Sequence, residues 1–176
     1  MSVLVSLMCH PDNEPKVSVE GAVLNRTPGY GDAIRSAITQ ALDQGKDLVV
    51  ADSDGYHPKA EVEKLASLTF TGDHGLVKPY RTNMGFQSEA YAWAYSFLKG
   101  RWVGDPTGGL YRMSFGFMGS LRTLEAKDST ITVEVVNRAL SEGTDILQYG
   151  YQAGENDREH SKRPSLYPLK LLKAMA

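Results

Sequence analysis

The sequence contains only one cysteine, little net charge and no long hydrophobic run. A disulfide needs two cysteines, so Cys9 alone excludes an internal disulfide framework, and we expect a reducing compartment, the cytoplasm. A net charge of −2 provides no positive field that would hold nucleic acid by its phosphates, so we expect no nucleic-acid partner. No apolar run approaches the roughly 20 residues needed to cross a bilayer, so we expect no transmembrane segment and only peripheral contact with any membrane.

Two further absences narrow the class of protein. The sequence has no Lys-bearing phosphate loop of the form G-x-x-x-x-G-K-[ST], which argues against a P-loop enzyme. It also has no internal repeat, low-complexity tract or linker, so its 176 residues predict one domain that spans residues 1–176. The apolar start, Met1–Met8, has no basic stretch before it and indicates a buried first strand rather than a signal peptide.

Strand-like and helix-like segments alternate along the chain. From Ala33 to Leu42, apolar residues recur at helical spacing, with Asp32 placed as an N-cap and Gly45 as a C-terminal stop. Asp47–Ala51 is a short apolar run typical of a strand buried on both faces, and Pro58 suits the first turn of a following helix. Further strands are expected over 2–8, 17–24, 75–80, after 109 and over 144–151, and further helices over 85–99 and 130–141.

This alternation predicts the α/β class, with βαβ units, a mostly parallel central sheet and helices on both of its faces. In such folds, ligands bind beyond the carboxyl ends of the strands. The loop after the 47–51 strand is therefore the first place to look for chemistry.

Two aspartates, Asp52 and Asp54, come directly after that strand. A spacing of two places both carboxylates on the same side of an extended chain, and two hard oxygen ligands suit Mg²⁺ or Mn²⁺ carrying a substrate diphosphate. A cation in that position would stabilise a departing nucleoside diphosphate. Aspartates after strands are also common in turns and helix caps, so the pair alone leaves a structural role open.

Three blocks of sequence are together more specific than this pair. They are the Gly-rich turn Asn25-Arg26-Thr27-Pro28-Gly29-Tyr30-Gly31-Asp32-Ala33, the stretch Asp52-Ser53-Asp54-Gly55-Tyr56-His57-Pro58, and the stretch Asp105-Pro106-Thr107-Gly108-Gly109-Leu110-Tyr111-Arg112. In this order they resemble family-2 glycosyltransferases of the dolichyl-phosphate mannosyltransferase type, which have a GT-A fold. The turn also resembles that of mannosylglycerate synthases. The resemblance extends over residues 25–150.

The resemblance implies roles for particular residues. Asp52 and Asp54 would bind the Mn²⁺ or Mg²⁺ ion and the donor phosphates, with Asp54 the most direct ligand. Gly29 and Gly31 would let the backbone approach the donor sugar or phosphate. Asp105, the catalytic candidate, would lie near the acceptor as a general base or as an anchor for a sugar hydroxyl.

Three other sites are weaker candidates. Arg112 would contact a donor or lipid phosphate, because guanidinium binds such oxygens bidentately, although it lies one residue later than the family's arginine. Arg81 is a similar candidate. His160 would supply a third metal ligand, as a C-terminal histidine does in some GT-A enzymes, and a solvated loop is the alternative for its segment. The core, rather than a sugar platform, is expected to hold the aromatic residues Tyr91, Trp93, Tyr95 and Trp102.

The sequence departs from the family in its front half. Family members carry a Pro-x-Tyr-Asn-Glu loop and a strand that ends in Asp-Asp-Gly-Ser, which together hold the nucleotide. Here Asn13-Glu14 is the only trace of the first, and the second is missing, so we expect a GT-A-like sheet truncated in its N-terminal half. A shortened sheet leaves an edge that needs covering, which favours a homodimer.

These observations predict a metal-dependent glycosyltransferase. It would move a hexose, mannose-like by resemblance and with inversion, from a nucleoside-diphosphate sugar to an acceptor hydroxyl or phosphate on a lipid or small molecule. Two alternatives stay open: a non-catalytic nucleotide- or sugar-binding module derived from such an enzyme, and another metal-dependent enzyme acting on a diphosphate.

Overall fold

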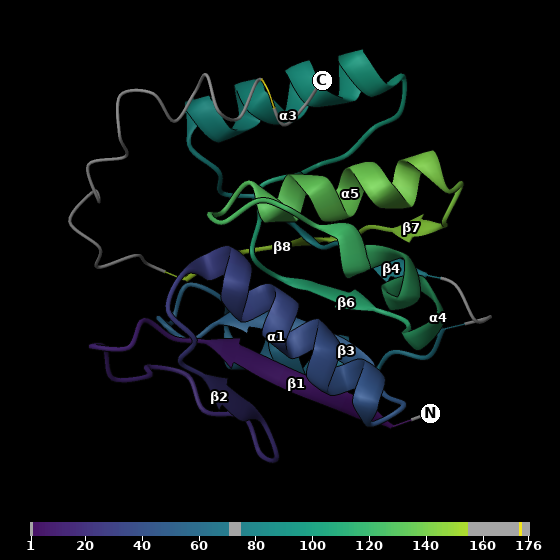
Figure 1. Cartoon of the computed structure of the whole chain (residues 1–176). Coiled ribbons are helices and arrows are strands. Elements are labelled where there is room, and N and C mark those ends of the chain that lie inside the picture. Colours follow the sequence, from purple (N-terminus) through teal and green to yellow (C-terminus); the bar gives the residue numbers. More distant parts are fainter. Residues whose placement is uncertain (1, 71–74, 155–172, 174–176) are drawn as a thin grey trace.

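A computed structural model describes residues 2–70, 75–154 and 173 of the chain (Figure 1). Its centre is a sheet with the strand order β2-β1-β3-β6-β4-β7. The strands of this sheet are β1 (Val3–Met8), β2 (Val23–Asn25), β3 (Asp47–Asp52), β4 (Leu76–Val77), β6 (Tyr111–Met113) and β7 (Ile146–Leu147). Two further short strands, β5 (Tyr80–Arg81) and β8 (Gly150–Tyr151), pair in parallel as a second sheet.

The main sheet is mostly parallel, as the sequence predicted. β1 pairs in parallel with both β2 and β3, and β4 pairs in parallel with β7. β6 is the exception, because it lies between β3 and β4 and runs antiparallel to both. The register places Met8 opposite both Asn25 and Asp52, so the carboxyl ends of three neighbouring strands lie in line.

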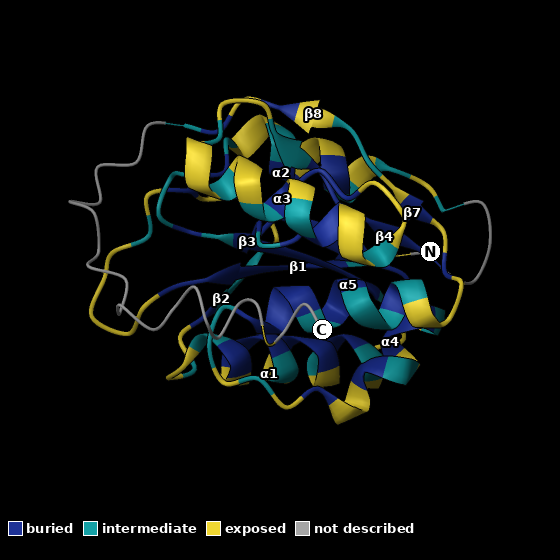
Figure 2. Cartoon of the chain, turned by 90° about the horizontal axis from the view of Figure 1, so that it is seen from above, coloured by how far each residue is buried: buried dark blue, intermediate teal, exposed yellow. Residues whose placement is uncertain are grey.

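Helices cover both faces of the sheet (Figure 2). The helices are α1 (Tyr30–Asp43), α2 (Lys59–Ser67), α3 (Phe86–Lys99), α4 (Phe115–Met118) and α5 (Ile131–Ser141), with a 3-10 helix at Gly119–Thr123. One hydrophobic core joins the sheet to α1, α4 and α5, and a second core joins its other face to α2. α3 lies beyond α5 at one end of the molecule, and the Tyr95 hydroxyl donates to Asn137 Oδ1 of α5 at 2.8 Å (Figure 1).

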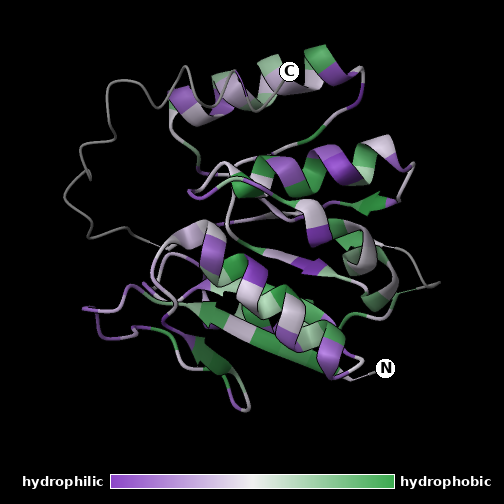
Figure 3. Cartoon of the chain, in the orientation of Figure 1, coloured by the Kyte–Doolittle hydropathy of each residue, from purple (hydrophilic) through white to green (hydrophobic). Residues whose placement is uncertain are grey.

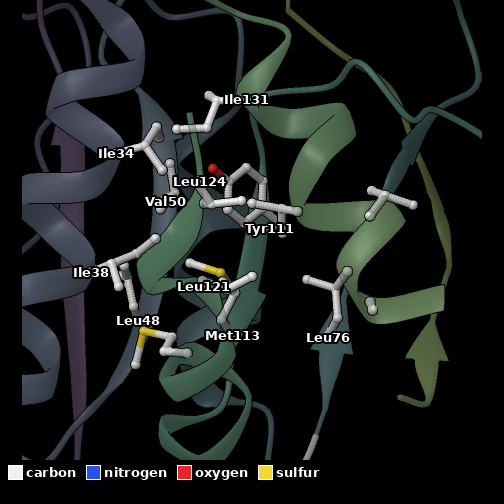
Figure 4. Close-up of a cluster of buried hydrophobic side chains, with 14 of the residues drawn as sticks. Ile34, Ile38, Leu48, Val50, Leu76, Tyr111, Met113, Leu121, Leu124 and Ile131 are labelled. Atoms are coloured by element: carbon white, nitrogen blue, oxygen red, sulfur yellow. The ribbon is translucent and has the colours of Figure 1, made fainter. Parts of the chain in front are cut away.

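The sheet is stabilised by burial of its aliphatic side chains on both faces. Hydrophobic residues concentrate along β1 and β3, whereas the helices carry hydrophilic residues between hydrophobic ones (Figure 3). Figure 4 shows the larger core, in which Leu48 and Val50 of β3 face Ile34 and Ile38 of α1. Full burial of such a side chain contributes about 1.5–3 kcal/mol relative to exposure, so this packing stabilises β3 at the centre of the sheet.

Most of the expected elements are present, with informative differences. α1 begins at Tyr30 with Gly29 as its N-cap, so the prediction of Asp32 as N-cap is wrong, and Asp32 lies in the first turn instead. Gly45 adopts φ 62° directly after the helix, as expected of a C-terminal stop. The strand expected over 75–80 is split into β4 and β5 around Pro79, which has no N–H to donate to a ladder.

The strand expected over 17–24 is mostly absent, because β2 includes only Val23–Asn25, and the connection from β1 to β2 differs most from expectation. Residues 9–22, all of them described, contain no helix or strand, although a parallel strand pair is usually joined by a helix. Val17 and Val19 are buried in the core beside α2, so this segment fills the space that a crossover helix would occupy. The amides of Lys16 and Val17 donate to the Ser53 carbonyl, at 2.7 and 3.1 Å, rather than to a strand.

The central position of β3 predicts the effect of a Leu48→Ala substitution. Leu48 is fully buried, so we expect the substitution to lower the free energy of unfolding by about 2–5 kcal/mol, through lost burial and an unfilled cavity. The matched control is Leu147→Ala, because Leu147 lies on the edge strand β7 and is largely exposed, and we expect a change within about 0.5 kcal/mol. Urea denaturation measures both, and equal losses would contradict the placement of β3.

Candidate functional site

The three sequence blocks meet beyond the carboxyl end of β3. The Tyr30 hydroxyl, from the Gly-rich turn, donates to the carboxylate of Asp52, the last residue of β3. A Cβ built on Gly109 would lie 2.7 Å from the Tyr30 hydroxyl oxygen and 2.8 Å from Asp52 Oδ2. The 105–109 turn therefore lies directly against the acidic loop, residues 52–58, and a side chain at position 109 would displace Tyr30 or Asp52.

Asp52 and Asp54 have different surroundings within the loop. Asp54 Oδ1 accepts a hydrogen bond from the Tyr56 amide at 3.1 Å, which holds the tight turn at Gly55, whose φ is 88°. Asp52 Oδ2 lies 3.5 Å from Nε2 of His57, a side chain that is 1% exposed. The Tyr151 hydroxyl and His57 Nδ1 are 2.9 Å apart, so the imidazole is positioned from β8.

Asp105 and Arg81 form a buried ion pair beside this loop. The guanidinium donates from Nε to Asp105 Oδ2 at 2.5 Å and from Nη2 to Asp105 Oδ1 at 3.0 Å, a bidentate arrangement. Its remaining Nη1 donates to the Tyr56 hydroxyl at 2.9 Å. Arg81 therefore connects β5, the acidic loop and the 105–109 turn, and the structure favours it over Arg112 as the arginine of the site.

The Arg81 pair affects the chemistry that Asp105 can perform. Burial alone would raise the pKa of Asp105, but hydrogen bonds from Arg81 and Thr107, with the charges of Arg81 and Lys78, hold that pKa below its usual value. A carboxylate with a lowered pKa and with both oxygens already accepting hydrogen bonds is a weak proton acceptor. The geometry thus supports Asp105 as an anchor more than as a general base.

Lys78 is a charged residue of the site that the sequence analysis missed. Its side chain is 1% exposed and its Nζ donates to the Gly108 carbonyl at 2.5 Å, so it holds the 105–109 turn from beneath. Burial lowers the pKa of Lys78 from 10.5 to about 8, against the opposing attraction of Asp105. The signal in the sequence was a lysine inside the apolar strand run from Leu76 to Tyr80.

The glycines of the Gly-rich turn serve the fold. Gly29 has φ 86°, which a residue with a side chain rarely adopts, and it begins α1. A Cβ on Gly31 would lie 2.1 Å from the Ala126 carbonyl oxygen, and the Gly31 amide donates to the Lys127 carbonyl at 3.0 Å. The space beside Gly31 is therefore filled by the protein's own backbone, so the prediction that Gly31 admits a donor does not fit this structure.

Arg112 lies away from the acidic loop, contrary to expectation. Its Nη2 donates to Asp47 Oδ2 at 2.7 Å, at the opposite end of β3. Its Nη1 donates to the carbonyls of Leu65, Ala66 and Leu68 at the end of α2. With the side chain buried in these contacts, Arg112 is not placed to bind a phosphate, and it instead joins α2 to the sheet.

The expected third metal ligand, His160, lies outside the described residues. Within residues 2–70 and 75–154, no group of three or more His, Cys, Asp or Glu side chains is arranged to hold a metal ion. Gly154, near the end of the described chain, donates its amide to the Tyr56 carbonyl at 3.0 Å. The chain therefore leaves the described region from beside the acidic loop.

The aromatic residues expected in the core divide into two groups. Tyr95 is fully buried, as expected, but Trp93 is 67% exposed and Trp102 is 47% exposed. The two indole rings meet edge to face, with their centroids 5.0 Å apart. The expectation of a core position is therefore wrong for both tryptophans.

Comparison with known proteins identifies the fold. No protein-family model and no curated protein matches this sequence. The structure is similar to glucosyl-3-phosphoglycerate synthase from Mycobacterium tuberculosis in complex with UDP, with a TM-score of 0.69 and 15% identity, covering 99% of this chain and 78% of that one. For the same synthase with Mn²⁺, UDP and phosphoglyceric acid, the TM-score is 0.68 and the identity 18%, covering 99% and 74%.

A further crystal structure, of a mycobacterial protein, matches with a TM-score of 0.64 and 19% identity, covering 89% of this chain and 68% of that one. These likenesses show the GT-A-like fold that the resemblance predicted. They do not single out the dolichyl-phosphate mannosyltransferase group. None of the helices in the described ranges has the length and apolar character needed to cross a membrane.

The lowered pKa of Lys78 predicts a pH dependence of stability. Between pH 8 and pH 10.5 the unfolded chain binds this proton and the fold releases it, so stability should rise with pH in this window. The Lys78→Met variant has no titrating group at this position. The free energy of unfolding of the wild type, minus that of the variant, should therefore increase between pH 7 and pH 10. Urea denaturation at several pH values measures the difference. Equal pH dependence of stability in the wild type and in Lys78→Met would contradict this prediction. Lys59→Met, at an exposed lysine, serves as the control.

The contacts of Arg112 predict a loss of stability rather than of ligand binding. Arg112→Met leaves the Asp47 carboxylate buried without its cation, so we expect a cost of about 3–5 kcal/mol in the free energy of unfolding. The exposed Arg122→Met should change stability by at most about 0.5 kcal/mol. Thermal or urea unfolding measures both. A variant of normal stability that failed to bind a nucleoside diphosphate would restore the phosphate role.

Proposed function

We propose that this protein is a metal-dependent glycosyltransferase that moves a hexose from a nucleoside-diphosphate sugar to an acceptor. One observation carries the proposal: Asp52 and Asp54 lie at the carboxyl end of β3, with Tyr30 and Gly109 packed around Asp52. Parallel-sheet proteins bind ligands at this edge. Solved structures of similar fold hold UDP together with Mn²⁺ or Mg²⁺.

The side chains of the acidic loop fit a hard divalent cation. Two carboxylates come from one short loop, and Mg²⁺ and Mn²⁺ sites commonly use one or two carboxylates together with substrate phosphates and water. His57 Nε2 is buried near Asp52 without a hydrogen-bond partner among the described residues. The interior of the loop therefore contains a polar atom that could still form a hydrogen bond. When bound, the cation would act as a Lewis acid toward the departing diphosphate.

The protein's own residues then hold and orient the reactants. The pKa of Tyr30 is raised by burial and by the charge of Asp52, so its hydroxyl stays protonated and keeps Asp52 oriented. Lys78 fixes the 105–109 turn through the Gly108 carbonyl, and its positive charge interacts with the carboxylates of Asp105 and Asp52. Arg81 holds Asp105 rigidly, and we assign to Asp105 the anchoring of a hydroxyl on the acceptor or the donor sugar.

His160 completes the proposed ligand set. The Gly154 amide donates to the Tyr56 carbonyl, so the chain passes the acidic loop before it reaches residue 160. A histidine nitrogen would add a third protein ligand to the two carboxylates.

Several finer properties follow from the resemblance alone. It favours mannose and inversion, whereas the structurally similar synthases are named for glucosyl transfer, so an assay should offer both sugars and read the anomeric configuration of the product by NMR. A homodimer formed at the sheet edge, and a cytoplasmic location with peripheral membrane contact, remain expectations from the sequence.

The connection at residues 9–22 has no helix or strand, in the front half where the sequence departs from the resembled family. This departure favours one alternative, a non-catalytic module that binds a nucleotide or a sugar. This alternative predicts binding of a nucleotide or a sugar without release or transfer of sugar. It is therefore separated from the enzyme by the turnover measurement below.

Thermal unfolding with Mn²⁺ and nucleoside diphosphates tests the donor site. A ligand at about a hundred times its Kd adds about 2.7 kcal/mol of stability. For a chain of this length, that should raise the Tm by roughly 5–10 °C. We expect such a shift with Mn²⁺ and UDP or GDP together, and a smaller shift with either component alone.

Asp54→Asn should remove both the shift and metal-dependent release of sugar, while leaving the Tm without ligand within about 2 °C of the wild type, since Asp54 is partly exposed. His160→Ala should weaken Mn²⁺ binding and so reduce the Mn²⁺-dependent shift and turnover, as Asp54→Asn does. The control is Asp43→Asn, at the exposed end of α1, which should behave as the wild type. A normal Mn²⁺-dependent shift and turnover in Asp54→Asn would overturn the metal role.

A further inference from the structure

A pocket of about 290 Å³ opens beside Arg81, between β5, the first half of α3 and residues 102–104. Neither Asp52 nor Asp54 lines it, so it is separate from the proposed metal site. Its lining includes Tyr80, Arg81, Glu89, Trp93, Trp102 and Gly104. This is the size of a small-molecule site, with apolar walls and a few polar groups.

The two tryptophans form one wall of the pocket. Trp93 is 67% exposed and Trp102 47% exposed, although side chains this large and apolar are usually largely buried in a folded protein. Their rings contact each other edge to face at 5.0 Å between centroids, so each indole keeps a face available. Exposed aromatic surface gathered at a pocket indicates that a ligand covers it.

The wall is held rigidly by hydrogen bonds from two neighbouring elements. Ser96 Oγ of α3 donates to the Val103 carbonyl at 3.2 Å and accepts from the Val103 amide at 2.9 Å. Gln148 donates from Nε2 to the Trp102 carbonyl and accepts from the Gly104 amide at Oε1, both at 2.9 Å. Because these contacts fix the backbone before any ligand arrives, binding to this wall requires little ordering of the protein.

The pocket adjoins the place where the proposed transfer would occur. Gly104 lines the pocket and Asp105 follows it directly in the chain. Arg81 lines the pocket with part of its side chain while its guanidinium is bonded to Asp105 and Tyr56. A molecule in the pocket would therefore lie against the indole wall and beside the Arg81 side chain, which binds Asp105 from the other side.

The charges of the lining do not favour an anion. Arg81 is the cationic residue among those that line the pocket, and its charge is balanced by the bidentate contact with Asp105. Glu89 is exposed and adds a negative charge at the rim. Phosphate recognition relies on available guanidinium or ammonium groups, and the described lining offers none.

We propose that this pocket is the acceptor site and that it binds a neutral, hydroxyl-rich molecule, a glycoside or polyol. Its apolar face would lie on Trp93 and Trp102, and a hydroxyl would donate to the Glu89 carboxylate. This proposal rests on the proposed function, because it names the acceptor class of that reaction. It differs from the phosphorylated acceptors bound by the synthases of similar fold.

Tryptophan fluorescence tests the proposal directly, because the chain's two tryptophans, Trp93 and Trp102, both line this pocket. The probes are methyl hexosides, disaccharides and inositol on one side, and glycerol 3-phosphate and 3-phosphoglycerate on the other. Each is added to the full chain with Mn²⁺ and UDP present. We expect a saturable change in tryptophan fluorescence with at least one neutral probe, and no change with the two phosphorylated compounds.

A matched pair of variants on α3 links the signal to the pocket. Trp93→Ala should weaken binding of the neutral probe about tenfold or more, with Trp102 still reporting, because tryptophan anchors in pockets carry much of the binding energy. Phe97→Ala removes an aromatic side chain that is 88% exposed on the same helix but lies outside the pocket lining, and it should leave binding unchanged.

Three outcomes would overturn the proposal. They are a response to the phosphorylated acids alone, the absence of a response to every neutral probe, and a fluorescence shift that depends on protein concentration without ligand. The last would show that two copies of the chain cover the indole wall. All three are independent of the thermal shift with Mn²⁺ and UDP, so a failure here is distinct from a failure of the proposed donor site.

Discussion

The bidentate contact between Arg81 and Asp105 is the interaction that gives the site its shape. It joins β5 to the 105–109 turn, and its third bond reaches Tyr56 in the acidic loop. All three partners are wholly or partly removed from water, where removal of one member of an ion pair is costly. The two loops that meet at Asp52 therefore keep their separation because one guanidinium bonds to both.

The two ends of β3 have different surroundings, and this explains why the predicted phosphate role of Arg112 is wrong. Asp47 begins the strand and is bound by Arg112, whereas Asp52 ends it and faces Tyr30 and Gly109. Because β6 runs antiparallel to β3, each later residue of β6 lies further from the acidic loop. A displacement of one residue from the family's arginine also turns the side chain to the other face of the sheet.

Local sequence patterns predicted most helices and strands, because burial determines both the pattern of apolar residues and the element that forms. The apolar run 47–51 is typical of a central strand, and the position of the Asp52–Asp54 loop followed from the end of that strand. The contact between Tyr30 and Asp52 joins residues of separate blocks, so order along the chain suggested their proximity but not the hydrogen bond. Lys78 was missed because its burial depends on β4, β6 and the 105–109 turn together.

The tryptophans show the limit of such patterns. α3 is rich in alanine and aromatic residues, a composition equally typical of a buried helix and of one that presents a surface. Its inner face is set by Ala92, Tyr95 and Ser96, and this leaves Trp93 outside. Which face packs depends on α5 and the sheet, and no local spacing contains that information.

The helix-free connection between β1 and β2 has a mechanical consequence. Two successive amides, of Lys16 and Val17, share the carbonyl of Ser53, the residue between the two aspartates. Any change of backbone conformation at Ser53 must therefore either break these two hydrogen bonds or move the segment at Lys16 and Val17 with it. Motion of the acidic loop would thus be transmitted through residues 16–22 to β2, the strand on the far side of β1. The edge of the sheet and the loop would therefore move together.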